Sequence, residues 1–156
     1  MIEAIRKKKR SIMMIICVAA VISIVSIHFI GRKPFKNIKS SDIVSATVLL
    51  EPPDETIVIT DVSELVADLN DVVIYNRNQS YHNYVGQAVT FTLTMSDGTQ
   101  MKVMAYNPFI VINGIGYKTK YEPCEKLNRY ANRLLEEKPG SKLLRKQLFV
   151  KQAFCA

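Results

Sequence analysis

Cys124 and His82 are the first side chains to consider for chemistry, because a thiol beside an imidazole can act as an activated nucleophile. His28 lies in a long apolar run, which leaves His82 as the one histidine available for proton transfer. A reactive cysteine also needs an exposed, electropositive setting that lowers the pKa of its thiol. Cys124 instead begins the apolar face of a predicted helix, so we expect it in the core.

Other patterns for catalysis or cofactor binding are missing from the sequence. The chain has no zinc-type spacing of cysteine and histidine, no serine-nucleophile elbow and no P-loop. Cys17 lies in the apolar run, which leaves Cys124 and Cys155 as a pair that the spacing does not demand. We therefore predict no enzymatic activity, no catalytic residues, no cofactor and no metal. A thiol activity that depends on Cys124 is the remaining enzyme hypothesis.

Carboxylates recur every three or four residues along one predicted helix. They are Asp61, Glu64, Asp68 and Asp71. Residues at this spacing share a helix face, where a row of carboxylates could bind a cation. A solvated helix face is the favoured interpretation, because the same spacing arises on any amphipathic surface.

The Gly114-x-Gly116 pair could be taken for part of a phosphate-binding loop. It lacks the third glycine and the helix that should follow at once. Two apolar runs around Asn113-Gly114 instead predict a hairpin with a type I′ turn, because that turn needs φ > 0 at both central residues. Its register places Gly116 opposite Val111, where the missing side chain leaves room for a neighbour.

Alternation of apolar and polar residues fixes the register of a second hairpin, in "AVTFTLTMSDGTQMKVMAY". A three-residue loop over 96–98, with Gly98 left-handed, pairs Phe91 with Val103 and keeps the apolar residues on one face. A two-residue loop would mix the faces, because a one-residue slip inverts every side chain.

An earlier hairpin joins "DIVSATVLL" to "ETIVITD" through a proline-rich turn. We predict that Val48 pairs with Ile59 and Leu50 with Ile57, around a loop over 52–55. This pairing places four apolar residues on one face.

Two amphipathic helices complete the predicted domain. The first begins at an Asp61-x-x-Glu64 capping-box pattern. The second starts near Pro123, whose missing N–H is unneeded there, and ends at Pro139-Gly140. Its core face comprises Cys124, Leu127, Ala131, Leu134 and Leu135. The expected fold is α+β, in the order β-β-α-β-β-β-β-β-α: a small antiparallel sheet with two amphipathic helices on one face.

The N-terminal residues predict a membrane anchor. Residues 11–30, "SIMMIICVAAVISIVSIHFI", are twenty residues without a charge, and "RKKKR" and "GRK" flank them. A helix of this length spans about 30 Å, the thickness of a bilayer's hydrocarbon core. The run is long for a signal peptide, and no small-x-small cleavage site follows it. We expect an uncleaved transmembrane helix over 11–30, preceding the α+β domain, with the lipid bilayer as its partner.

Charge is distributed unevenly along the chain. Residues 1–40 carry nine Lys/Arg and one acid, residues 41–137 seven and thirteen, and residues 138–156 five and none. Nucleic-acid binding is not expected, because the positive charge lies outside the predicted domain. The slight excess of positive charge before the span favours a cytoplasmic N-terminus. We predict a cytoplasmic basic tail (1–10), the span (11–30), a linker (31–41), an extracytoplasmic domain (42–138) and a poorly ordered basic tail (139–156).

Candidate partner contacts lie on a polar sheet face and in an aromatic loop. They are Tyr81, His82, Tyr84, Thr92 and Lys102. Tyrosine-rich loops on a rigid sheet often form contact sites. An ordinary solvated face beside an ordinary loop is the alternative, because single exposed aromatic residues are normal.

Residues 42–137 resemble single-pass membrane-anchored extracytoplasmic domain proteins of Gram-positive bacteria, a group without an established activity. The segments that carry the resemblance are "LLEPPDETIVITD", "VGQAVTFTLTMSDGTQ" and "YNPFIVINGIGYKTKYEPCEKLNRYANRLL". More loosely, they are similar to extracytoplasmic tails of membrane proteins that sense antibiotics or cell-wall stress. The tail after Pro139 departs from the group. The resemblance implies location and architecture, and it carries no catalytic residue across.

From these observations we expect a membrane-anchored extracytoplasmic binding or sensory module at the cell membrane, without catalytic activity. Another membrane or envelope protein is a candidate partner. The alternative is a structural or assembly protein that acts through its transmembrane helix, with the domain as a spacer. Exchanging the span for an unrelated one would distinguish the two.

Overall fold

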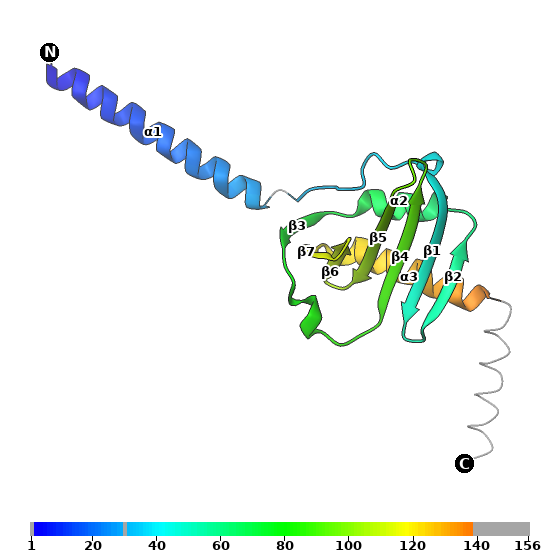
Figure 1. Cartoon of the computed structure of the whole chain (residues 1–156). Helices are drawn as coiled ribbons and strands as arrows, with labels where there is room; N and C mark the ends of the chain where they lie inside the picture. Colours follow the sequence, from blue (N-terminus) through cyan, green and yellow to red (C-terminus); the bar gives the residue numbers. More distant parts are fainter. Residues whose placement is uncertain (1, 30, 139–156) are drawn as a thin grey trace. The chain divides into compact units, whose positions relative to one another are not determined.

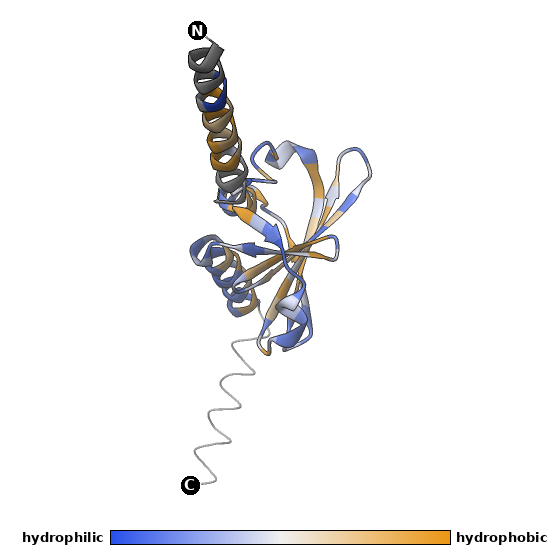
Figure 2. Ribbon diagram, turned by 90° about the vertical axis from the view of Figure 1, so that its left-hand side faces the viewer, coloured by the Kyte–Doolittle hydropathy of each residue, from blue (hydrophilic) through white to orange (hydrophobic). Residues whose placement is uncertain are grey.

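The computed structural model describes residues 2–29 and 31–138 of the chain, which divides into two compact units between Arg32 and Lys33 (Figure 1). The first unit contains α1 (Ile2–Phe29), a helix of 28 residues. Figure 2 shows hydrophobic residues along the coloured middle of α1. Within the described residues, which leave out the side chains at 2–8, 11 and 24–29 of α1, no helix is long and apolar enough to cross a membrane. The predicted tail over 139–156, with Cys155, lies outside the described residues.

The second unit is the α+β domain that the sequence predicts. Its strands are β1 (Ile43–Glu51), β2 (Glu55–Ile59), β3 (Ile74–Arg77), β4 (Ala88–Met95), β5 (Gln100–Tyr106), β6 (Phe109–Ile112) and β7 (Ile115–Thr119). Its helices are α2 (Ser63–Asp71) and α3 (Tyr121–Glu137), with short 3-10 turns η1 (Ser40–Asp42) and η2 (Ser80–Asn83). The predicted α+β class and the order of strands and helices are confirmed.

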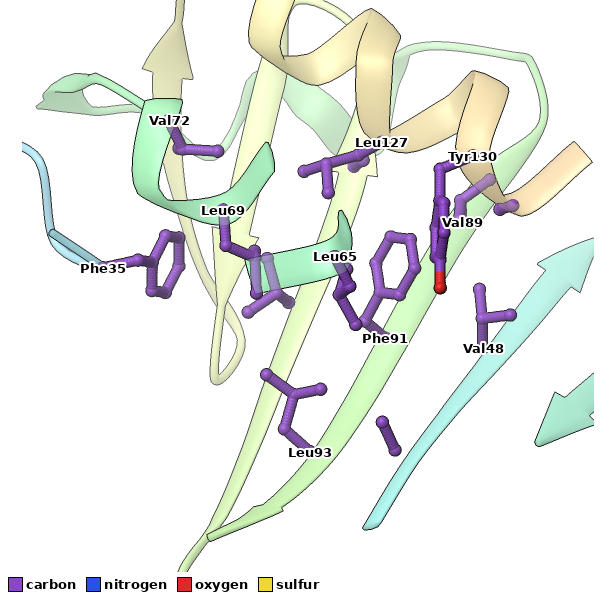
Figure 3. Packing of buried hydrophobic residues seen from close by; sticks show 14 of the residues in the cluster. Phe35, Val48, Leu65, Leu69, Val72, Val89, Phe91, Leu93, Leu127 and Tyr130 are labelled. Atoms are coloured by element: carbon purple, nitrogen blue, oxygen red, sulfur yellow. The ribbon is translucent and has the colours of Figure 1, made fainter. Parts of the chain in front are cut away.

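The seven strands form one antiparallel sheet in the order β2-β1-β4-β5-β6-β7-β3. Helix α3 packs against α2 and against β1, β2, β4 and β5, so both helices cover one face, which we call the inner face. Figure 3 shows the core between these layers. Its fully buried members include Val48, Val89, Phe91 and Leu93 from the sheet and Leu65, Leu69 and Leu127 from the helices.

Two predicted hairpin registers are confirmed. Strands β4 and β5 pair Phe91 with Val103 around a loop in which Gly98 has φ 82°. Strands β6 and β7 pair Val111 with Gly116 around Asn113-Gly114, both with positive φ.

The predicted register of β1 with β2 is wrong by two residues. Val48 pairs with Ile57, and Leu50 with Glu55. A shift of two keeps the same side chains on the inner face, so the apolar pattern could not exclude it. The turn decides the register: Asp54 takes a left-handed conformation with φ 62°, and its N–H donates to the Leu50 carbonyl at 2.8 Å.

The predicted start of α2 also needs correction. The helix begins at Ser63, and the Asp61–Glu64 capping box does not form. Asp61 instead accepts a hydrogen bond from the Ser63 backbone N–H at 2.9 Å. A side chain that bonds two residues ahead forms a turn before the helix, which delays the first helical residue.

The compact domain begins earlier than the predicted boundary at residue 42. Phe35, within the expected linker, is only 2% exposed and belongs to the core cluster. Figure 3 shows its ring pointing toward Leu69 and Val72. Lys33 also lies 3.7 Å from the carboxylate of Asp71 on α2. Residues 33–41 therefore pack as part of the domain.

Candidate functional site

Cys124 lies in the core, as predicted. Its side chain is completely buried, and its Sγ donates to the Phe109 carbonyl at 3.4 Å. Burial raises the pKa of the thiol to about 12. A thiol with this pKa stays protonated at neutral pH and is therefore a poor nucleophile. His82 is exposed at η2, where its ring stacks on Tyr81 with centroids 3.9 Å apart.

The carboxylates of α2 face basic residues of α3. Arg133 binds Glu64, and Lys126 lies 3.4 Å from Asp71. Among the described residues, no three His, Cys, Asp or Glu side chains gather as a metal site. Glu64 and Asp71, two of the four carboxylates in the row, therefore join the two helices by ion pairs, each of which contributes about 0.2–1 kcal/mol.

Asp68 differs from its neighbours because burial, followed by repulsion from Glu64, raises the pKa of its carboxyl group. The folded state therefore disfavours the ionised form, so the protein loses stability as pH rises from the ordinary pKa to the raised one. We predict that Asp68→Asn raises the free energy of unfolding at pH 7 and that this gain shrinks below about pH 4. Urea unfolding of the variant and the original protein, at pH 7 and below about pH 4, measures this difference in the free energy of unfolding.

Asp71→Asn is the matched control on the same helix. Asp71 has two lysine partners, Lys33 and Lys126, so its loss should lower the free energy of unfolding by roughly 0.2–1 kcal/mol. A less stable Asp68→Asn variant at pH 7 would contradict the assignment.

The aromatic loop around η2 folds over the outer face of the sheet, the face opposite the helices. Phe109 and Val111 point to this face, yet they are only 2% and 5% exposed. Tyr84 meets the Phe109 ring edge-on at 5.2 Å, and Tyr81 lies 6.5 Å from the same ring. Tyr81 also lies over Gly116, as the gap predicted there allows.

The five candidate contact residues fall into two groups. Tyr81 and Tyr84 pack on β6 and β7, and His82 stacks on Tyr81. Thr92 and Lys102 pair with each other on β4 and β5, and Lys102 is exposed. Tyr84 belongs to a hollowed site, described next.

A pocket of about 240 Å³ lies where three segments meet. These segments are the loop before β4, the turn between β5 and β6, and the first half of α3. The lining residues are Tyr84, Val85, Gly86, Gln87, Tyr106, Asn107, Tyr121, Glu125 and Asn128. We call this the amide–tyrosine pocket.

Hydrogen bonds fix two walls of the amide–tyrosine pocket. Gln87 donates through Nε2 to the Pro52 carbonyl at 2.9 Å and accepts through Oε1 from Asn132 at 3.1 Å. Its side chain thus connects the β1–β2 turn to α3. At the second wall, Asn107 donates through Nδ2 to Glu125 at 3.1 Å, which connects the β5–β6 turn to α3.

Two carbonyl oxygens at this pocket have no hydrogen-bond partner. They are the Oδ1 atoms of Asn107 and Asn128, both shielded from solvent. The carboxylate of Glu125 fixes the orientation of the Asn107 amide, because only the NH₂ end can donate to it. A buried unpaired carbonyl costs roughly 1–3 kcal/mol, so a ligand that supplies donors would remove an unfavourable feature.

The mouth of the pocket is aromatic and apolar. Tyr106 is 9% exposed and forms part of the wall, whereas Tyr84 and Tyr121 are 52% and 66% exposed. Val85 is fully exposed beside them. Pockets that combine rings with a few converging polar groups are typical ligand sites.

Among the lining residues, Tyr84 was a candidate contact from the sequence, and the polar residues were not. Glu125 and Asn128 have the i,i+3 spacing of any helix surface, so their spacing carries no signal. Asn107 precedes Pro108, and this pair of residues indicates a turn rather than a binding site. Comparison with protein-family models, curated proteins and solved structures finds no match for this chain.

Proposed function

We propose that this chain is a membrane-anchored binding module that recognises its ligand through the amide–tyrosine pocket. The observation that carries the proposal is the pair of unpaired buried oxygens, on Asn107 and Asn128, at a pocket with an exposed aromatic mouth. Unpaired buried polar atoms are rare in folded proteins and call for an explanation. Among the described residues, Asn70 Oδ1 is a third such atom and lies outside this pocket, whereas the other two line the same pocket, where a bound ligand would supply their donors.

Anchoring is the second part of the proposal, and the sequence supports it. Residues 11–30 carry no charge, and α1 is helical through Phe29. In this account, the N-terminus lies in the cytoplasm and the domain is extracytoplasmic. A binding domain on such an anchor would meet envelope components rather than cytoplasmic ones.

A photocrosslinker at Val85 tests the binding function in intact cells. Val85 is fully exposed at the mouth of the pocket, so a benzophenone side chain there should react with whatever occupies the pocket. The matched control is Val58, which is 69% exposed on β2, at an edge of the sheet. We expect a defined crosslinked product from position 85 and none from position 58.

Two outcomes would contradict the binding function. One is the absence of any product at position 85 in cells that produce the full chain. The other is the same product at both positions, because this would indicate contact with the surface in general rather than with the pocket.

A further inference from the structure

Two side-chain oxygens of the amide–tyrosine pocket are acceptors that lack a donor. Gln87 donates one N–H to Pro52 and Asn107 donates one N–H to Glu125, which sets the orientation of both amides. The Oδ1 atoms of Asn107 and Asn128 remain without donors. A ligand that carries N–H groups would supply the donors that these two oxygens lack.

The charge of the pocket has one sign. Glu125 is the only Asp, Glu, Lys, Arg or His among its lining residues. Within residues 31–138, Glu125 forms no ion pair. Residues 33–138, the described part of the domain, carry thirteen acids against eleven Lys/Arg, so the net charge of the domain is slightly negative and does not oppose a cation.

The rings around the pocket favour the same ligand. Tyr84, Tyr106 and Tyr121 line it, and the face of an aromatic ring attracts a cation. The volume of about 240 Å³ is smaller than that of a typical drug-sized site. The pocket is therefore sized for a small group or for the end of a longer chain.

We propose that the amide–tyrosine pocket binds a primary ammonium group on a short aliphatic chain. Glu125 supplies the counter-charge, Asn107 and Asn128 accept N–H hydrogen bonds, and the tyrosine rings enclose the methylene groups. Both amide oxygens are shielded in the empty pocket, so binding includes a rotation of these two side chains, in which Glu125 exchanges its hydrogen bond from Asn107 for one from the ammonium group. This inference rests on the proposed binding function and names the ligand class of the same site.

The test uses the full chain in detergent micelles at pH 7 and three probes with five-carbon chains. These are cadaverine (two ammonium groups), 1,5-pentanediol (neutral) and glutarate (anionic). NMR shifts of the side-chain amides of Gln87, Asn107 and Asn128 report binding. We expect saturable shifts with cadaverine alone.

Glu125→Gln keeps an acceptor for Asn107 and removes the charge, so it should weaken cadaverine binding roughly tenfold or more, as expected when a charge-assisted hydrogen bond is lost. Glu122→Gln removes the same charge from an exposed position on the same helix, outside the pocket, and should change the affinity less than about twofold. Nanodiscs of phosphatidylethanolamine, compared with phosphatidylcholine, show whether a lipid headgroup can supply the ammonium group.

The outcomes separate this inference from the binding function. Equal binding of pentanediol, or unchanged cadaverine affinity in Glu125→Gln, would overturn the ammonium assignment. If cadaverine gives no saturable shift while crosslinking at position 85 persists, the assignment fails and the binding function stands. If the crosslinks are also missing, both fail.

Discussion

Gly116→Ala is expected to lower the free energy of unfolding by about 2–3 kcal/mol, because the new methyl group meets atoms that cannot all move aside. A Cβ at this position would lie 2.4 Å from the Asn78 carbonyl oxygen and 2.7 Å from the Tyr81 ring. The ring could rotate away, but the carbonyl belongs to the backbone. It is also held in place, since the Asn78 N–H donates to the Gly116 carbonyl at 2.9 Å.

The same substitution should also disturb the pocket. Tyr84 lines the pocket and contacts Phe109, so lifting the loop over 78–84 moves one pocket wall and exposes the Phe109 ring. We therefore expect Gly116→Ala to lose ligand binding together with stability. Urea unfolding of the full chain in micelles, followed by tyrosine fluorescence, measures the stability. The signal reports on the domain because all seven tyrosines lie between residues 75 and 130.

Gly86→Ala is the control for the Gly116 prediction. A Cβ there would lie 3.7 Å from the Tyr106 hydroxyl, which is ordinary contact. Replacing glycine where alanine fits reduces the freedom of the unfolded chain, so stability should stay equal or rise by up to about 1 kcal/mol. If Gly116→Ala were as stable as Gly86→Ala, the aromatic loop would not pack on β7 as described.

Phe35→Ala is expected to lower the free energy of unfolding by about 3–5 kcal/mol, the usual range for removing a buried phenyl ring. Phe35 is 2% exposed and packs beside α2, although it lies in a segment that reads as a basic linker. Typical domains are stable by only about 5–15 kcal/mol, so the variant should be close to unfolding at growth temperature.

Lys36→Ala is the matched control, since Lys36 is exposed one residue further on. Its effect should stay within about 0.5 kcal/mol. The same urea titration followed by tyrosine fluorescence measures both variants. If Phe35→Ala lowered the free energy of unfolding by less than about 1 kcal/mol, the domain would begin after this residue, as the composition of residues 31–41 suggested.

Local patterns predicted much of the fold. In the β4–β5 hairpin, a slip of one residue would have turned Phe91 and Leu93 outward, so alternation selected the three-residue loop over the two-residue loop at this turn. The Asn113-Gly114 pair likewise favoured a type I′ turn, in which both residues have positive φ. The β1–β2 register was predicted wrongly because a shift of two residues keeps the same side chains on the inner face. The left-handed conformation of Asp54 decides the register, and the amino-acid pattern does not indicate that conformation.

The pocket was not predictable in the same way, because its lining comes from segments far apart in the chain. Gln87, Asn107 and Glu125 each look like ordinary polar surface residues in sequence. Their role depends on the hydrogen bonds from Gln87 to Pro52 and from Asn107 to Glu125, and on the Asn107 Oδ1 atom that stays unpaired. The gap at Gly116 was predicted, but its occupant was not, because the path of the loop over 78–84 follows from tertiary packing.

The central claim is that residues 11–30 hold the domain on the outer side of the cell membrane, and cysteine labelling in intact cells tests it most directly. Cys124 cannot serve as the labelling site, because its side chain is completely buried and the pKa of its thiol is about 12. A Thr56→Cys variant in a Cys155→Ser background places an exposed thiol on β2 instead. The account predicts that a membrane-impermeant maleimide labels Thr56→Cys before lysis and labels Glu3→Cys, in the same background, only after it. Labelling of Glu3→Cys in intact cells, with Thr56→Cys protected until lysis, would contradict the account.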